Sequence, residues 1–186
     1  MKRAFDLTIA LIAFVVLLFP MLAIAFLVKV SSRGPVLFWS DRVGVNNTTF
    51  KMPKFRTMHR NTPPIATHLL KNADSYLTAV GPFLRRYSLD EIPQLWSILR
   101  GDMSLVGPRP ALYNQDDLIA MRTARGIHRL VPGITGWAQI NGRDRISIPV
   151  KVEYDEYYLH HKSFSFDLRI LWMTFAKVIR SEHIQH

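Results

Sequence analysis

Asp90 and Glu91 stand side by side in the stretch SLDEIPQLWSILRGDMSLVGPRP, residues 88–110. A carboxylate can attack an electrophile or hold a cation, so an adjacent pair offers both kinds of chemistry. A structural role also fits, because Ser88 and Glu91 match the capping box that begins many helices. Pro93, however, is better placed as the first helical residue, which would leave both carboxylates just outside the helix. The positive helix end would then favour their ionised forms.

Arginines stand on either side of this acid pair. Arg109 lies between Pro108 and Pro110, and because proline restricts both itself and the residue before it, the turn is stiff. A surface arginine in a tight turn is one interpretation, and a rigid fork for a phosphate group is the other. Arg85 lies shortly before Asp90. Acids that attack or hold a cation, with arginines that hold phosphate, predict a site for phosphoryl chemistry.

The sequence lacks the patterns of several common nucleotide-binding and metal-binding sites. The chain contains neither the G-x-x-x-x-G-K-[ST] loop of ATP-binding proteins nor the G-x-G-x-x-G dinucleotide fingerprint. It has no cysteine, so thiolate metal sites and disulfides are excluded, and its histidines show no metal-ligand spacing.

The elements that must position these residues form one α-rich α+β domain. Aromatic and β-branched residues around Asn46 and Asn47 predict a β-hairpin over 35–58, with Pro53 at a sheet edge. The remaining predicted elements are a loop and short helix over 61–74, a helix over 86–101 ended by Gly101, Gly/Pro loops over 107–114 and 131–145, and two helices from Val150 onward. The last helix is apolar over most of its circumference, which fits either a core helix or one lying in a membrane interface.

The net charge is +10, and most of it lies in residues 1–60, which also contain the longest apolar run. A basic chain needs an anionic partner such as nucleic acid, anionic lipid or a phosphorylated molecule. Nucleic-acid modules rarely combine a basic surface with a long apolar run, whereas proteins on an anionic membrane often do.

The apolar run extends from Leu7 to Val28 and is just long enough to cross a bilayer core of about 30 Å. It could be a signal peptide, a plain transmembrane anchor or a re-entrant hairpin. Pro20 breaks the helical bond to the carbonyl of Val16 and predicts a kink. Basic residues flank both ends of the run, Lys2 and Arg3 on one side and Lys29 and Arg33 on the other. The positive-inside rule then favours a bent helix that enters and returns.

The chain resembles a known family, the bacterial sugar transferases of the small monotopic phosphoglycosyl transferase type. The resemblance rests on motifs found along almost the whole chain: KRAFD (2–6), GPVLFWSDRVG (34–44), FKMPKFRTM (50–58), GPFLRRYSLDEIPQLWSILRGDMSLVGPRP (81–110), PGITGWAQINGR (132–143) and YDEYYLHHKSFSFDLRILWMTF (154–175). The chain departs from the family at Phe19, where serine often precedes the membrane proline.

The resemblance implies a role for each site residue. Asp90 would be the nucleophile that attacks a UDP-sugar and becomes phospho-glycosylated, with Mg²⁺ at its carboxylate. Glu91 would assist the second step, in which polyprenol phosphate attacks the intermediate. Arg56, Arg85 and Arg109 match positions that bind phosphate or shape the site.

The resemblance also implies the setting. Residues 1–32 would form a re-entrant helix broken at Pro20, and residues 33–186 a catalytic part on the cytoplasmic face of the bacterial inner membrane. The expected partners are a UDP-sugar, undecaprenyl phosphate and the phospholipid membrane, and an N-acetylated hexosamine is the favoured sugar. Nucleic acid is not expected as a partner. A homo-oligomer is compatible with the resemblance. The alternative is a basic membrane scaffold that binds anionic lipid or nucleic acid without chemistry.

Overall fold

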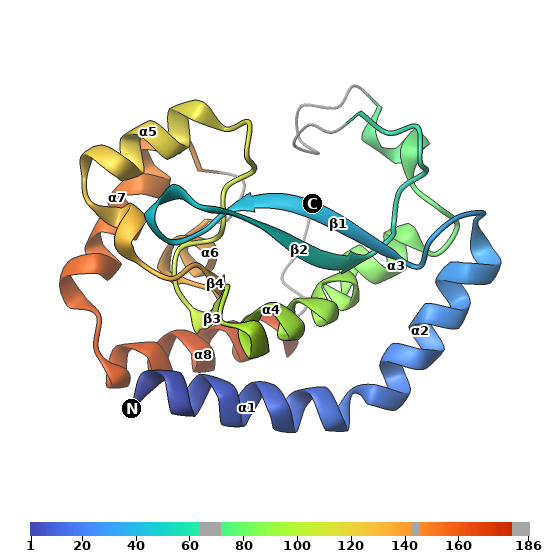
Figure 1. Cartoon of the computed structure of the whole chain (residues 1–186), viewed down its shortest axis with the longest axis horizontal. Coiled ribbons are helices and arrows are strands. Elements are labelled where there is room, and N and C mark those ends of the chain that lie inside the picture. The colour runs from blue at the N-terminus through green and yellow to red at the C-terminus, as the bar shows by residue number, and fades with distance from the viewer. Residues whose placement is uncertain (64–71, 143–145, 180–186) are drawn as a thin grey trace.

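Helices surround two small two-stranded sheets in the computed structural model of the chain (Figure 1). The structure describes residues 1–63, 72–142 and 146–179. The predicted α-rich α+β fold is therefore confirmed in its class. Most of the loop and short helix predicted over 61–74 lies outside the described residues, and its last part belongs to a short 3₁₀ helix, η3 (Ala73–Tyr76).

The apolar run forms two helices, α1 (Lys2–Val16) and α2 (Leu18–Ser31), which meet at Leu17 with a bend of 60°. Pro20 lies in the first turn of α2, where it has no N–H to give to the carbonyl of Val16, so the bond that would continue α1 is missing. In the described part of the chain no single helix is long and apolar enough to cross a membrane, whereas the bent pair together passes that test.

The predicted hairpin is confirmed. Strands β1 (Leu37–Val43) and β2 (Thr49–Phe55) pair in antiparallel register, from Leu37 opposite Phe55 to Val43 opposite Thr49. A short 3₁₀ turn, η1 (Val45–Asn47), joins the strands. Its two asparagines have φ values of 52° and 59°, and asparagine tolerates this left-handed region better than most residues. Because the sheet has only these two strands, Pro53 lies in an edge strand, as predicted.

The helix predicted over 86–101 is wrong as one element. The chain instead forms α3 (Gly81–Arg86), a 3₁₀ helix η4 (Leu89–Gln94) and α4 (Leu95–Arg100). Ser88 separates α3 from η4 because its backbone is left-handed, with φ 53° and ψ 24°. Gly101 ends α4 with φ 105°, which confirms the predicted stop.

Strands β3 (Ser104–Val106) and β4 (Gly133–Thr135) form a parallel pair that was not predicted: β4 lies within the predicted loop over 131–145, and β3 lies just before the predicted loop over 107–114. The backbones cross very closely just after β3, since a Cβ on Gly133 would lie 2.1 Å from the Gly107 nitrogen. Only glycine permits this approach, and the crossing fixes the start of the Pro108–Pro110 turn.

The remaining described elements lie after β3. They are α5 (Asp116–Ala124), η5 (Ile127–Arg129), α6 (Trp137–Asn141), α7 (Ile148–His161) and α8 (Phe164–Ile179). The two predicted C-terminal helices are thus confirmed. In α8, Ile170 is buried while Trp172 and Phe175 are exposed, so the helix packs one side on the core and presents an apolar side outward.

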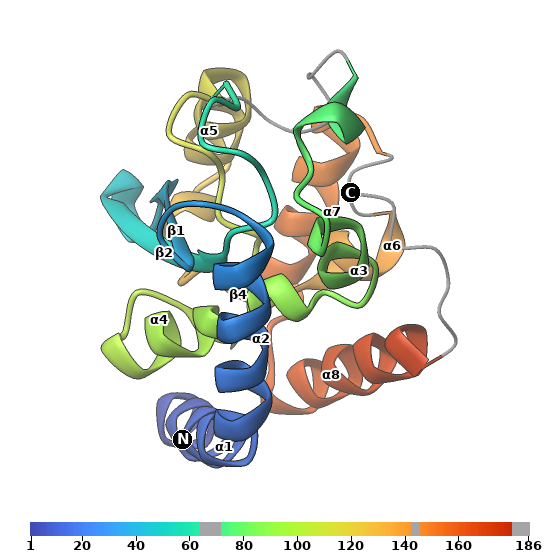
Figure 2. The same cartoon turned by 90° about the vertical axis from the view of Figure 1, so that its right-hand side faces the viewer.

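The central core joins the first and last helices through the middle of the chain. Ala10 of α1, Met52 of β2, Ile98 of α4 and Ile170 of α8 are all buried in it. A smaller cluster under α2 contains Ile24, Val28, Phe55 and Leu84. Both N-terminal helices are therefore part of the folded unit on one side and exposed on the other. Figure 2 shows α1, the lower part of α2 and α8 on the same lower side of the molecule.

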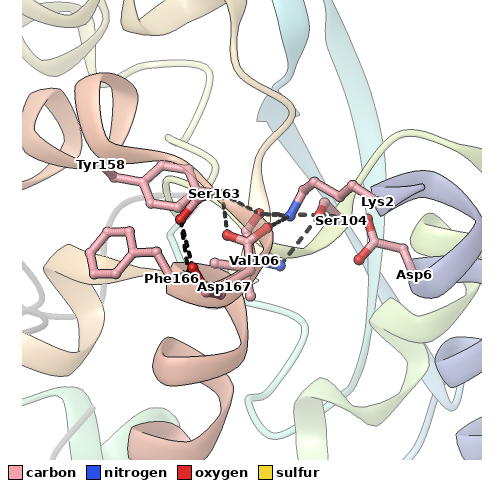
Figure 3. Close-up of polar contacts among 9 residues, drawn as sticks. Lys2, Asp6, Ser104, Val106, Tyr158, Ser163, Phe166 and Asp167 are labelled. Carbon is pink, nitrogen blue, oxygen red and sulfur yellow. Dashed lines mark hydrogen bonds and ion pairs between the residues drawn. The ribbon is translucent and has the colours of Figure 1, made fainter.

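A buried polar network fastens α1 to this unit (Figure 3). Lys2 Nζ pairs with Asp167 Oδ2 of α8 at 2.5 Å and donates to the Val106 carbonyl. Tyr158 of α7 donates to Asp167 Oδ1 at 2.7 Å. Ser104 of β3 donates to Asp6 Oδ2 at 2.8 Å, so Lys2 and Asp6 of α1 both contact β3.

Candidate active site

The 3₁₀ helix η4 carries both carboxylates into the protein interior, where Asp90 and Glu91 are 4% and 8% exposed. The prediction that Pro93 begins the helix is wrong, because Pro93 lies inside η4 and α4 begins at Leu95. The two acids consequently sit within the first helical turn rather than before it. Ser88 makes no side-chain capping bond, so the alternative structural interpretation as a capping box is not met.

Glu91 is held by two cations. Arg109 contacts it with both arms of its guanidinium, Nη2 to Oε1 at 2.6 Å and Nη1 to Oε2 at 3.3 Å. Lys54 of β2 donates to the same Oε1 at 2.8 Å. Burial by itself raises the pKa of Glu91, but the charges and hydrogen bonds of Arg109 and Lys54 outweigh it and hold the pKa well below its usual range. Glu91 is therefore a permanent anion near neutral pH.

Asp90 is different, because its Oδ1 is buried without a hydrogen-bond partner. Burial raises its pKa, and the neighbouring negative charge of Glu91 adds to the rise. The charges of Lys54, Arg85 and Arg109 oppose the shift. The expectation that a helix end favours ionised Asp90 is therefore wrong in direction, and the cations around it decide how readily it ionises. A buried, weakly solvated carboxylate with an unpartnered oxygen is suited to nucleophilic attack or to cation binding.

The turn that carries Arg109 is braced from α5. Arg122 donates through Nη1 to the Arg109 carbonyl at 2.9 Å and through Nη2 to Asp155 of α7 at 2.5 Å. Both members of this ion pair are buried. Together with the close crossing at Gly107, the brace holds the turn from which Arg109 reaches Glu91.

Arg85 lies near the carboxylates without bonding to them. Its Nε donates to Thr57 Oγ1 at 2.9 Å. Burial lowers the pKa of Arg85, and the charges of Asp90 and Glu91 oppose this, so its guanidinium lies within their field. The structure thus brings together four predicted site residues: Asp90, Glu91, Arg85 and Arg109.

Arg56 is the predicted site residue that lies elsewhere. It is buried, but its Nη2 donates to the backbone oxygen and the hydroxyl of Ser32, both at 2.8 Å, at the end of α2. No bond joins Arg56 to Asp90 or Glu91 among the described contacts.

Sequence reasoning missed Lys54 and Arg122. Strand alternation places Lys54 on the side of Phe50 and Met52, and a lysine on an apolar face needs a buried partner, so this signal was present. Arg122 lies four residues after Leu118, and both are buried on α5. The helix itself has little apolar patterning, so no comparable signal marks Arg122 in the sequence.

A magnesium ion fits the residues around Asp90. No cluster of three or more potential metal-ligating side chains occurs among the residues that the structure describes. Mg²⁺, however, commonly binds through one or two carboxylates and the phosphates of its substrate. Asp90 Oδ1 has no donor, whereas both oxygens of Glu91 are occupied by cations, so Asp90 is the available ligand.

Comparison with known proteins identifies similar chains. The model of a family described as bacterial sugar transferase matches residues 1–181. The chain is 42% identical over its whole length to the uncharacterized sugar transferase EpsL of Bacillus subtilis, and it covers 90% of that protein.

Two further relatives have more specific names. The chain is 39% identical to the undecaprenyl-phosphate glucose phosphotransferase of Komagataeibacter xylinus, over 98% of this chain and 36% of that protein. It is 36% identical to the UDP-N-acetylgalactosamine-undecaprenyl-phosphate N-acetylgalactosaminephosphotransferase of Aeromonas hydrophila, over 96% of this chain and 43% of the relative. The chain therefore spans less than half the length of these two relatives.

Proposed function

The chain belongs to the bacterial sugar transferase family, and from this premise we propose that it transfers a sugar 1-phosphate from a UDP-sugar to undecaprenyl phosphate and releases UMP. The named relatives act with undecaprenyl phosphate, one on glucose and the other on N-acetylgalactosamine. Because one of them is a glucose enzyme, these names do not favour the N-acetylated donor over other UDP-hexoses.

The observation that carries this proposal is the environment of Asp90. One of its oxygens is unpartnered, and three cations, Lys54, Arg85 and Arg109, surround two carboxylates. The excess positive charge suits a substrate that brings a pyrophosphate. Glu91 keeps Lys54 and Arg109 beside Asp90 in the absence of that substrate.

The reaction divides into two displacements. An oxygen of Asp90 attacks the phosphorus that carries the sugar, and the bond from this phosphorus to UMP breaks, leaving the sugar phosphate on Asp90. A phosphate oxygen of undecaprenyl phosphate then attacks the same phosphorus, the bond to Asp90 breaks, and the carboxylate is restored. Arg85 and Arg109 hold phosphate oxygens in both steps, and Glu91 assists the second by fixing the cations that meet the incoming lipid phosphate. Mg²⁺ held by Asp90 would neutralise phosphate charge.

The setting is the cytoplasmic face of the inner membrane, with residues 1–32 as a re-entrant anchor and residues 33–186 as the catalytic part. The bend before Pro20 and the exposed apolar side of α1 and α2 support this arrangement. A helix pair bent in this way enters the bilayer and returns, and its basic flanks stay on the cytoplasmic side.

A test of Asp90 needs no acceptor. Wild-type protein incubated with Mg²⁺ and a panel of UDP-sugars should release up to one UMP per active site with the matching donor. It should also gain the mass of a phospho-sugar on the peptide that contains Asp90. Asp90→Asn should lose the adduct and reduce turnover by roughly a thousandfold or more, because an amide does not attack phosphorus. Glu91→Gln should be impaired but form some adduct.

The matched control is Asp117→Asn, which makes the same chemical change at an exposed position of α5 and should behave as wild type. Full turnover by Asp90→Asn, or an adduct on another residue, would refute the assignment. UMP release that begins only after undecaprenyl phosphate is added would indicate a single direct displacement.

A further inference from the structure

A second basic site lies where the chain leaves α2, apart from the residues around Asp90. A pocket of about 640 Å³ opens there between the segment after α2, the segment after β2 and η3. These segments meet at the right of the view in Figure 1. We call it the Arg33–Arg60 pocket; the lining residues used below are Ser31, Ser32, Arg33, His59, Arg60 and Tyr76. Backbone pairing holds two of these segments together, since the His59 backbone nitrogen donates to the Tyr76 carbonyl at 2.8 Å and Met58 forms an antiparallel β-bridge with Leu77.

Arg56 lies directly behind this pocket and is incompletely satisfied. The residue is 5% exposed, and its Nη2 bonds to Ser32, which lines the pocket. Its Nε and Nη1 are buried and have no hydrogen-bond partner. A buried guanidinium with unpaired donors is costly unless an anion is close by.

A second arginine approaches the same point. A Cβ on Gly34 would lie 2.4 Å from Arg56 Nη1 and 3.1 Å from Arg60 Cδ, so the two side chains converge on this glycine. Burial lowers the pKa of Arg56, and the positive charge of Arg60 lowers it further. Within residues 1–63, 72–142 and 146–179, none of the ion pairs involves Arg33, Arg56 or Arg60. Converging cations without a carboxylate indicate a site for an anion.

The location indicates what carries the anion. Phe26, Leu27 and Val30 are exposed on α2, and the pocket begins at the very next residue, Ser31. If α2 lies in the bilayer, as proposed above, the pocket lies at the depth of lipid phosphates.

We propose that the Arg33–Arg60 pocket binds the phosphate group of a membrane lipid, with Arg33 and Arg60 as its direct contacts and Arg56 as the buried charge behind them. The lipid is the undecaprenyl phosphate acceptor or an anionic phospholipid, and both present the same chemistry. The inference rests on the proposed function only for its placement at the membrane.

The test measures binding without any donor. The protein in detergent micelles is titrated with farnesyl phosphate, and farnesol serves as the uncharged comparison. In a second arm, binding is measured to vesicles of phosphatidylglycerol and of phosphatidylcholine. Replacing both exposed arginines, Arg33→Gln with Arg60→Gln, should weaken binding in at least one arm about tenfold or more, because each lost contact is a charge-assisted hydrogen bond. Arg129→Gln, which removes the same charge from exposed η5, should change neither arm.

The outcomes separate the two sources. Weaker binding of farnesyl phosphate with unchanged vesicle binding assigns the pocket to the acceptor, and the opposite result assigns it to phospholipid. Unchanged binding in both arms, in a variant whose thermal unfolding matches wild type, overturns the inference. Arg33→Lys with Arg60→Lys, which keeps both charges, should recover most of the binding if charge carries the interaction, and failure to recover any would count against it. Failure of every UDP-sugar to release UMP would refute the proposed function, while the binding arms would still decide the lipid site.

Discussion

At the residue scale, Lys54 acts on both carboxylates. It bonds directly to Glu91, and it is the largest of the charges that oppose the raised pKa of Asp90. Burial lowers the pKa of Lys54 itself, while Glu91 counters that effect and helps keep the ammonium charged. One lysine thereby supports an anion that is always charged and a second carboxylate that can exchange protons.

Replacing Lys54 should move the acid limb of the pH–rate profile to higher pH. Lys54→Met keeps an unbranched side chain of nearly the same length but removes the charge, so the pKa of Asp90 should rise further. Since the attacking form is ionised, the rate of the UMP burst should fall most at low pH and recover as the pH increases. We expect a loss of about ten- to a hundredfold near neutral pH. The measurement is the burst rate against pH in the absence of acceptor.

Lys51→Met is the control on the same strand. Lys51 forms an exposed pair with Asp41 and should leave the profile unchanged. An acid limb at the same pH in Lys54→Met and wild type would show that Lys54 does not set the ionisation of Asp90.

Sequence reasoning reached the candidate site in part. Asp90, Glu91, Arg85 and Arg109 were recognised by residue type and local spacing, and the structure brings them together. The pairing of Lys54 with Glu91 depends on the contact between β2 and η4, which joins residues 37 positions apart and has no local pattern. The predicted direction of the shift in the Asp90 pKa was wrong because a helix end is a local property, whereas burial depends on the whole fold.

At the element scale, the polar network at the start of α1 holds three distant segments together. Asp167 accepts from Lys2 and Tyr158, and it is 4% exposed, so its loss would leave donors without an acceptor. Lys2 itself is 41% exposed along its side chain, and solvent weakens its ion pair accordingly. The hydrogen bonds to buried Asp167 therefore contribute most of the stability of this junction.

Asp167→Asn should destabilise the protein by about 2 kcal/mol. For a chain of this size the loss corresponds to a Tm lower by roughly 4 to 8 °C. Asp41→Asn removes an aspartate–lysine pair of the same kind from the exposed hairpin and should lower the Tm by roughly 2 °C or less. The measurement is thermal unfolding of both variants in the same detergent. Equal shifts would show that the network adds no more stability than a surface ion pair.

Elements with a regular pattern were predicted well, and elements built by tertiary contact were not. The hairpin has alternating apolar positions, and α8 is apolar over most of its length. Strands β3 and β4 are three residues each, too short for a pattern, and Ser104 pairs with Gly133 far along the chain. The break at Ser88 depends on a left-handed serine, which sequence propensity alone does not favour.

At the scale of the whole molecule, α1, α2 and α8 expose many large apolar side chains. Those of α1 and α2 face outward along their length, and α8 adds Leu168, Trp172 and Phe175. In both views α1, α8 and the lower part of α2 lie on the lower side of the molecule (Figures 1 and 2). An exposed apolar surface of this extent is typical of contact with a membrane.

Cysteine labelling can test the re-entrant arrangement, because the chain has no native cysteine. Single cysteines at Ala4, in the first turn of α1, and at Pro35, after α2, replace exposed residues and should react with a membrane-impermeant reagent from the cytoplasmic side only. A cysteine at Phe19, which is 81% exposed in the protein, should react from neither side because lipid covers it.

Reaction of either end from the periplasmic side would show a true span instead. Reaction at Phe19 from the cytoplasmic side would show that the bend lies in water. Pro20→Ala should straighten the helix pair and make a fraction of the molecules accessible on opposite sides.

The fastening of Lys2 to Asp167 also has a consequence for biosynthesis. The two residues are 165 positions apart, so α1 leaves the ribosome long before the helix that completes its polar junction exists. Until β2 and α4 have also been synthesised, Ala10 and the other core-facing residues of α1 lack the core residues that they pack against in the folded protein. A bilayer offers an apolar surface that can accept the helix during this time. We therefore expect the chain to reach the membrane while it is still being translated, and the catalytic part to fold afterwards onto a helix that is already inserted.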